Sequence, residues 1–196
     1  QTEETDMSTK EADVTTFEIH TEEQAPERAR SMLEKVREEY GFVPNLMGVL
    51  AEAPAALESY LALGQAFGKT SFTPVEQQVL LLSVSRFNGC TYCMAAHSAA
   101  ATMAGMEDET LRALRKGRDL PDPRLEALRR FTTVVQESRG EPSRDEIQAF
   151  LAQGFTRAQV LEVLVGVAMK TLSNYTNHLA NTPLDEAFAD FRWDEE

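Results

Sequence analysis

Apolar residues recur at intervals of three and four along most of the chain, which is the period of helices with one buried face. The first such run extends from Pro26 to Tyr40, and Gly41 ends it. A short helix is expected at about residues 46–51, and a longer one begins at Pro54, because proline favours the first helical turn. Alternation at the period of a β-strand is essentially absent. The pattern therefore predicts an all-α fold.

Two strongly apolar helices are predicted at the centre of that fold. The segment Thr73–Glu76 combines a capping threonine, a first-turn proline and an early acid, so a helix begins there. It is apolar over much of its circumference, which indicates a buried position. Asn88-Gly89 ends it, and a second buried helix, rich in alanine, begins near Cys90 and ends at Gly105. Further helices are predicted at about 107–116, 123–138, 143–152 and 156–172.

The polar residues divide the chain into one helical domain with two tails. Residues 1–22 are polar and acidic, so we predict a flexible tail that docks near its end. Residues 23–185 form the predicted domain, a compact bundle of paired helices. Residues 186–196 form an acidic tail with interspersed aromatic residues that suit packing on a neighbour.

The region with the two central helices, residues 73–105, has an echo in residues 155–181. Identical residues recur there at the same spacing, which suggests a duplicated helix pair. The matching positions include Gln78 with Gln159, Val84 with Val165 and His97 with His178.

The composition argues against several classes of function. A chain of 196 residues suffices for one domain with a real core, and its net charge of −13 argues against nucleic acid or an anionic membrane surface as partner. No apolar run approaches the roughly 18 residues that span a bilayer. Two cysteines without a leader suggest a cytoplasmic protein, in which a disulfide is more often catalytic than structural.

The chemistry is concentrated in Cys90, Cys93 and His97. Spacings of three and four residues place all three side chains on one helix face. The positive end of the helix dipole favours a thiolate, and an imidazole one turn from Cys93 can accept the thiol proton. Two sulfurs at this spacing can close a disulfide where the backbone allows it. The arrangement is typical of a thiolate that attacks a peroxide or disulfide, with a partner thiol that resolves the product.

Other uses of these residues are less favoured. Haem attachment needs a histidine directly after the second cysteine, where Met94 stands. A zinc site would use Cys90, Cys93 and His97 with His178 or a carboxylate as fourth ligand, but three ligands would crowd one helical turn and no second cysteine pair exists. An inert buried pair of small side chains remains the simplest alternative.

The stretch from Thr73 to His97, with its CxxCxxxH spacing behind an apolar helix and an Asn-Gly break, resembles the alkylhydroperoxidase D-like (AhpD-like), or carboxymuconolactone decarboxylase, superfamily. Tyr40–Asn45 and Asn174–Asn181 resemble its peroxidase-related branch. The resemblance covers roughly residues 25–185. It implies an all-α fold, a homo-oligomer (dimer, trimer or hexamer), and a cysteine-based peroxidase or disulfide reductase that needs no metal or haem. An external dithiol or lipoyl-type compound would be the reductant.

The resemblance also implies roles for the three residues. Cys93 would be the thiolate that a hydroperoxide oxidises to a sulfenic acid, Cys90 would resolve it as a disulfide, and His97 would belong to the proton relay. The helix-terminus argument alone instead favours Cys90 as the more acidic thiol. The two arguments disagree about which sulfur reacts first.

The chain departs from the family pattern at two relay positions. Gln78 stands where the family usually has a glutamate, and Tyr92 stands where it often has a histidine. An amide cannot act as a base, although it can orient a water or hydrogen-bond the thiolate. Glu76 lies about 200° around the helix from Gln78 and should not simply replace it. The proton relay should therefore contain fewer acid and base groups than is usual in the family, and its further candidates are Glu76, Tyr92 and His178.

Three functions are therefore compatible with the sequence. The first is a thiol-dependent alkyl hydroperoxidase or disulfide oxidoreductase. The second is a carboxymuconolactone decarboxylase-type lyase, which has no need of a CxxC pair. The third is a non-enzymatic, redox-sensing oligomer whose cysteine pair switches conformation.

Overall fold

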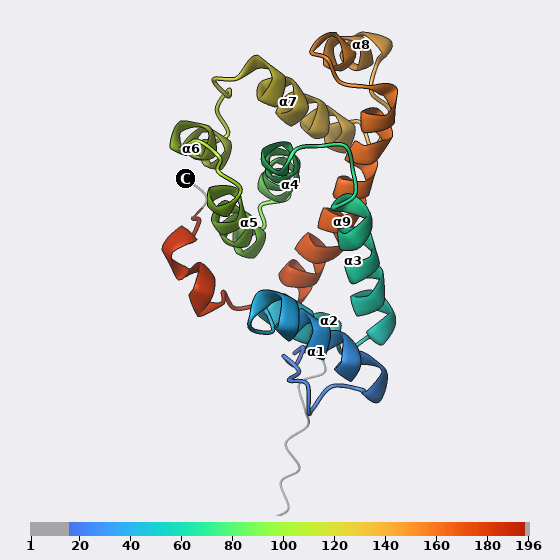
Figure 1. Ribbon diagram of the computed structural model, residues 1–196, viewed down its shortest axis with the longest axis vertical. Coiled ribbons are helices and arrows are strands. Elements are labelled where there is room, and N and C mark those ends of the chain that lie inside the picture. The colour runs from blue at the N-terminus through green and yellow to red at the C-terminus, as the bar shows by residue number, and fades with distance from the viewer. Residues whose placement is uncertain (1–15, 195–196) are drawn as a thin grey trace, which may run out of the picture.

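The computed structural model describes residues 16–194, and within this range the regular structure is helical (Figure 1). The all-α prediction is confirmed, and the predicted helix ends agree with the observed ones to within a few residues except in the last long helix. The elements are α1 (Glu27–Tyr40), α2 (Asn45–Leu50), α3 (Pro54–Phe67), α4 (Pro74–Phe87), α5 (Thr91–Met103), α6 (Asp108–Lys116), α7 (Pro123–Glu137), α8 (Arg144–Ala152), α9 (Arg157–Ala180) and the 3-10 helix η1 (Glu186–Phe191).

Helix α4 begins where the sequence predicts because its first turn satisfies its own backbone. Oγ1 of Thr73 accepts a hydrogen bond from the Glu76 backbone at 3.2 Å, and the Glu76 carboxylate accepts one from the Thr73 backbone at 2.8 Å. Ser143 and Thr156 start α8 and α9 with the same reciprocal arrangement. Local sequence therefore sets these helix starts without help from tertiary contacts.

The region that echoes α4 and α5 forms one continuous helix rather than a helix pair. Helix α9 has 24 residues and runs on to Ala180, beyond its predicted end at residue 172. Asn88-Gly89, which separates α4 from α5, corresponds to Met169-Lys170 in the echo. Methionine and lysine are good helix formers, whereas glycine costs about 1 kcal/mol in a helix interior. The second segment consequently lacks the break that produces a pair.

Helix α4 lies at the centre, in contact with α5, α6, α7 and α9, as its apolar circumference predicts (Figure 1). Its residues Leu80, Leu82 and Val84 are fully buried. Helix α9 approaches closely because Gly166 has no side chain: a Cβ atom there would lie 2.4 Å from Leu80 and 2.8 Å from Phe67. This close approach brings α9 against both α3 and α4.

The described parts of both predicted tails pack on the domain. His20 is buried, its backbone N–H donates to the Gly48 carbonyl at 3.2 Å, and its ring pairs with Glu52. Residues 1–15 of the predicted N-terminal tail, and residues 195–196, lie outside the described range. Near the C-terminus, Trp193 is buried and donates its indole N–H to the Arg115 carbonyl at 3.0 Å. The C-terminal segment thus packs on its own chain beside α5 and α6.

A helix that could cross a membrane would have to be both long and apolar, and none in residues 16–194 meets both conditions.

We predict that Gly166→Ala lowers the free energy of unfolding by about 1–3 kcal/mol, because the added methyl group overlaps Leu80 and Phe67 in a packed core. Urea unfolding measures the change. Gly64→Ala is the matched control, since a Cβ in this α3 position meets only the Met169 methyl at 3.8 Å and should be neutral or stabilising. Equal stability of the two variants would contradict the close approach of α9.

Candidate active site

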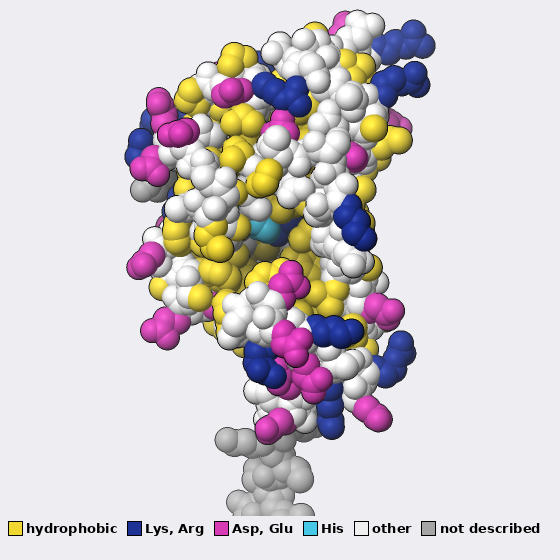
Figure 2. All heavy atoms as spheres, in the orientation of Figure 1, with side chains coloured by type: hydrophobic (Ala, Val, Ile, Leu, Met, Phe, Trp, Pro, Cys, Tyr) yellow, Lys and Arg dark blue, Asp and Glu magenta, His cyan; other side chains and the backbone are white. Residues whose placement is uncertain are grey.

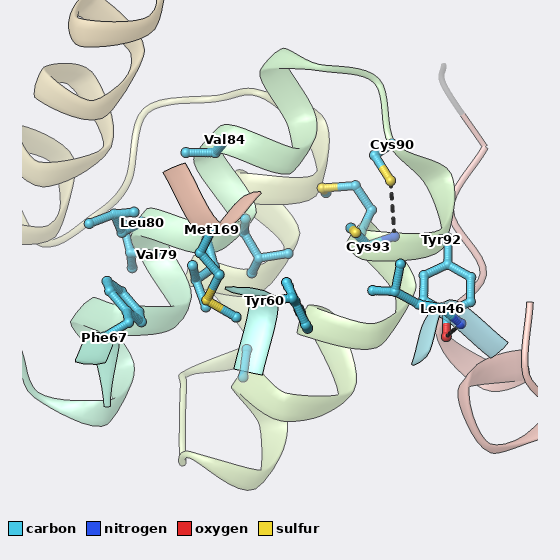
Figure 3. Packing of buried hydrophobic residues seen from close by; sticks show 14 of the residues in the cluster. Leu46, Tyr60, Phe67, Val79, Leu80, Val84, Cys90, Tyr92, Cys93 and Met169 are labelled. Carbon is cyan, nitrogen blue, oxygen red and sulfur yellow. Dashed lines mark hydrogen bonds between the residues drawn. The ribbon is translucent and has the colours of Figure 1, made fainter. Parts of the chain in front are cut away.

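Both cysteines lie at the start of α5, in the core (Figure 3). Gly89 has a positive φ of 65°, which allows the sharp turn from α4, and the Cys90 backbone N–H then bonds to the Ser85 carbonyl at 2.9 Å. Cys90 caps α5: its sulfur accepts a hydrogen bond from the Cys93 backbone at 3.4 Å. The two side chains are 1% and 2% exposed, respectively, and both are free thiols. The predicted spacing therefore produces a buried dithiol.

Helix α9 supplies the facing wall of the site. The Asn177 amide donates to the sulfur of Cys93 at 3.2 Å and to the sulfur of Cys90 at 3.7 Å. The Cys93 thiol also lies 3.9 Å from the Ser173 hydroxyl. Ser173 and Asn177 belong to a buried polar stripe on an otherwise apolar helix, which also contains Lys170 and Asn174. Polar residues that recur at helical spacing are the sequence signal for this stripe, but the CxxCxxxH motif on α5 predicts no site role for Lys170, Ser173 or Asn177.

His97 connects α5 to both neighbouring helices. Its Nδ1 lies 3.0 Å from Oε1 of Gln78, and its Nε2 lies 2.9 Å from Nζ of Lys170. With the amide oxygen of Gln78 facing the ring, Nδ1 carries the proton and Nε2 accepts a hydrogen bond from Lys170. Both ring nitrogens bond to these side chains, and neither bonds to a sulfur. Gln78 therefore sets the tautomer of His97.

The two thiols differ strongly in acidity. Burial raises the pKa of Cys93, but a hydrogen bond from the Cys90 thiol, the charge of Lys170, and hydrogen bonds from Lys170 and Ser173 together hold that pKa well below its ordinary value. The hydrogen bond to Cys93 and burial raise the pKa of Cys90. Burial and the charge of Lys170 lower the pKa of His97 well below its usual range, which keeps the ring neutral. This electrostatic balance favours Cys93 as the thiolate, in agreement with the role that the resemblance implies.

Two of the additional relay candidates have structural contacts away from the sulfurs. Oε1 of Glu76 accepts a hydrogen bond from Arg124 at 2.7 Å, while its other oxygen caps α4. His178 is exposed on α9, where its ring stacks on Tyr175 with centroids 6.4 Å apart. Helical geometry turns His178 about 100° away from the buried Asn177.

Tyr92, the third additional candidate, connects two distant segments to α5. Its hydroxyl donates to the Asp185 carboxylate and accepts from the Leu46 backbone at 3.4 Å (Figure 3). The same carboxylate accepts a hydrogen bond from the Asn45 backbone at 3.1 Å. Burial, then the hydrogen bond to Asp185, raise the pKa of Tyr92, so it remains a neutral phenol. Its contacts make it a structural residue.

The residues predicted as possible zinc ligands do not form a metal-binding cluster. Within the described residues, no group of three or more histidine, cysteine, aspartate or glutamate side chains is placed to hold a metal ion. The His97 ring, which that alternative would require, bonds to Gln78 and Lys170 instead.

The region that contains both cysteines is similar in sequence to a known family. Residues 51–133, which contain α4, α5 and both cysteines, match the model of the carboxymuconolactone decarboxylase family. This part of the chain is similar to that family. No curated protein matches the chain.

Three solved structures share the fold over nearly the whole chain. The AhpD core of a peroxidase-related protein from Ralstonia eutropha JMP134 has a TM-score of 0.77 at 22% identity, covering 88% of this chain and 93% of its own. A peroxidase-related protein from Silicibacter sp. TM1040 has a TM-score of 0.75 at 18% identity, with 90% and 94% covered. The debrominase Bmp8, in complex with 2,3,4-tribromopyrrole, has a TM-score of 0.71 at 16% identity, with 91% and 95% covered. The fold is thus AhpD-like.

We predict that Tyr92→Phe lowers the free energy of unfolding by about 1–3 kcal/mol, because the buried Asp185 carboxylate loses a hydrogen-bond donor. Urea unfolding measures this loss. Cys93 alkylation by iodoacetamide should stay within about twofold of the parent rate, since the phenol does not act on the sulfur. Tyr175→Phe, on the surface, serves as the control and should leave stability unchanged. Slower alkylation of Cys93 in Tyr92→Phe, without a loss of stability, would instead indicate that Tyr92 belongs to the proton relay.

Proposed function

We propose that this protein is a thiol-dependent hydroperoxidase or disulfide oxidoreductase in which Cys93 is the nucleophile and Cys90 resolves its oxidised product. The observation that carries the proposal is a pair of adjacent buried thiols in unequal surroundings: the Asn177 amide lies closer to the sulfur of Cys93 than to that of Cys90, and the Ser173 hydroxyl contacts Cys93. In these surroundings the pKa of Cys93 is lowered and that of Cys90 is raised. A nucleophile must be a thiolate at working pH, whereas a resolving thiol can keep its proton until the second step.

In the first step, the Cys93 thiolate attacks the terminal oxygen of a hydroperoxide. A sulfur–oxygen bond forms, the oxygen–oxygen bond breaks, and an alcohol leaves after its oxygen gains a proton. In the second step, the Cys90 sulfur attacks the resulting sulfenic acid, so a disulfide forms and water leaves. An external dithiol, which the family resemblance suggests is of the lipoyl type, then returns the pair to the reduced state.

The surroundings of the sulfurs support this chemistry. The Asn177 amide N–H stabilises negative charge on either sulfur, and its Oδ1 has no hydrogen-bond partner within the described residues, so it can accept the O–H of a bound hydroperoxide. Figure 2 shows a hollow near the middle of one face, with largely hydrophobic walls and a histidine visible inside. Such walls suit a small organic molecule better than a charged one.

Names of the structural neighbours also support a small organic substrate. Two are called peroxidase-related, and Bmp8 is a debrominase bound to a brominated pyrrole. Because one fold hosts several chemistries, the site residues carry the proposal. We further propose a homo-oligomer, for which α9 offers the exposed side chains Leu161, Leu164 and Leu179.

We predict that Cys93→Ser abolishes hydroperoxide consumption, whereas Cys90→Ser permits one turnover and leaves a sulfenic acid at Cys93. Stopped-flow measurement with an alkyl hydroperoxide gives the rate, and dimedone trapping with mass spectrometry locates the adduct. Consumption at the parent rate by both variants would overturn the proposal. Activity toward a lactone acid that survives thiol alkylation would favour the lyase, and a redox-dependent change of assembly without turnover would favour the sensor.

We also predict that the hydroperoxide rate constant rises less steeply between about pH 6 and pH 8 than that of a thiol with an ordinary pKa, because the lowered pKa of Cys93 leaves less thiol to ionise in this range. At pH values below its pKa, a thiol of ordinary pKa would react about tenfold faster for each unit by which the pH rises. Stopped-flow rates across this range measure the profile. In the Cys93→Ser variant, alkylation of the remaining Cys90 should still rise with pH, and a parent profile as steep as that of an ordinary thiol would contradict the lowered pKa of Cys93.

A further inference from the structure

Lys170 is a buried cation at the centre of the site. It lies in the middle of α9, its side chain is 0% exposed, and Nζ donates to Nε2 of His97 at 2.9 Å. Within the described residues it forms no ion pair with a carboxylate. Burying an ammonium group without a counter-charge is strongly unfavourable. The site must therefore contain another anion, or the lysine must be neutral.

Few groups around Lys170 can ionise. Cys90, Cys93 and His97 face it from α5, and Tyr60 reaches the site from α3. Helix α4 presents the uncharged Gln78 to the same cluster. Helix α2 has no ionisable side chain. The partly buried charges of α7 have their own partners: Arg129 pairs with Glu126, and Arg124 pairs with Glu76 of α4.

Only one of these groups can supply the negative charge that compensates the Lys170 ammonium group. Burial raises the pKa of Tyr60, so the phenol keeps its proton. His97 is neutral, with Nδ1–H bonded to Gln78 and Nε2 accepting from Lys170. The Cys90 thiol donates to Cys93. Cys93 is therefore the anion that compensates the ammonium group, and the two charges stabilise each other in a medium that screens them poorly.

We propose that Lys170 is a further catalytic residue, whose ammonium group holds Cys93 as a thiolate and donates the proton that the departing alkoxide requires. This inference rests on the function proposed above and names a group that supplies its proton. In this proposal Lys170 of α9 has the proton-relay role that the family resemblance gives to a glutamate at the position of Gln78 in α4. His97 acts as a positioning residue, because its Nε2 accepts one N–H of Lys170 and fixes the ammonium group beside the sulfur.

The proton balance closes with lysine as the shuttle. Lys170 gives one proton to the alkoxide and becomes a neutral amine as the sulfenic acid forms. The amine then takes the proton of the Cys90 thiol, and the resulting thiolate attacks Cys93. A disulfide forms, and the departing hydroxide takes that proton to leave as water. After the cycle the thiolate is gone, so a neutral amine suits the buried position until reduction restores the pair.

Thiolate titration tests the electrostatic half of the proposal and needs no peroxide. The Cys90→Ser variant isolates Cys93, and ultraviolet thiolate absorbance follows its ionisation against pH. Adding Lys170→Met should raise the midpoint by about 1–3 pH units, because the opposite charge is lost while the volume is kept. Lys170→Arg should restore most of the shift, and Lys69→Met, on the surface, should change nothing. An unchanged midpoint for Lys170→Met would overturn the charge pair.

Proton donation requires a second comparison in the same variants. At a pH above both midpoints, every protein is fully thiolate, so a remaining difference in hydroperoxide rate reports the leaving oxygen alone. Lys170→Met should stay at least about a hundredfold slower than its parent, the lower end of what a general acid typically contributes. Convergence of the rates would overturn the proton-donor role. If the Cys90→Ser parent does not react with the hydroperoxide, the proposed hydroperoxidase function is refuted. The titration would still show whether Lys170 stabilises the Cys93 thiolate.

A measurement that keeps Lys170 covers the case in which Lys170→Met does not fold. In protein with isotope-labelled lysine, nuclear magnetic resonance distinguishes the ammonium form from the amine. Cys93→Ser removes the anion, so the Lys170 signal should convert to the amine at a lower pH than in the reduced parent. The same titration midpoint in both proteins would overturn the proposal.

Discussion

The burial of the polar stripe of α9 against the first turn of α5 is the constraint on which the rest of the structure depends. Polar groups in a core are tolerated only when they find partners, and here the partners belong to different helices. The Asn177 amide reaches both sulfurs, and Lys170 reaches His97. These contacts require α9 to lie close to α4 and α5 in one register. Gly166 permits that approach, since any side chain there would overlap Leu80.

The C-terminal segment then encloses the thiols. Asp185 joins the Tyr92 hydroxyl to the Asn45 backbone, and Trp193 docks on the Arg115 carbonyl. As a result η1 covers α5, and the start of α2 meets the same helix (Figure 1). Exclusion of water makes each charge at the sulfurs act more strongly on its neighbours. The aromatic C-terminal segment therefore covers the helix that carries the thiols.

The departures from the family pattern acquire a physical meaning in this setting. Gln78 keeps contact with His97 but, as an amide, adds no charge, so the histidine stays neutral. Tyr92 points its hydroxyl toward Asp185. The site lacks the family's acid and base groups at these two positions, and it contains instead a lysine of α9, Lys170. A site with an ammonium group and a thiolate is neutral as a pair, which suits a buried position better than either ion alone.

The sequence by itself determined the features that depend on neighbours in the chain: the all-α class, the capping boxes at Thr73 and Thr156, and the common face of Cys90, Cys93 and His97. Helical period and backbone hydrogen bonding fix these locally. Only the tertiary structure decided which helix faces the sulfurs, because periodicity defines a face but not its partner. It therefore decided the roles of Lys170 and Asn177, and it gave Glu76 and His178 other surroundings. It also favoured Cys93 over Cys90, since the groups that set their acidity come from α9 as well as α5.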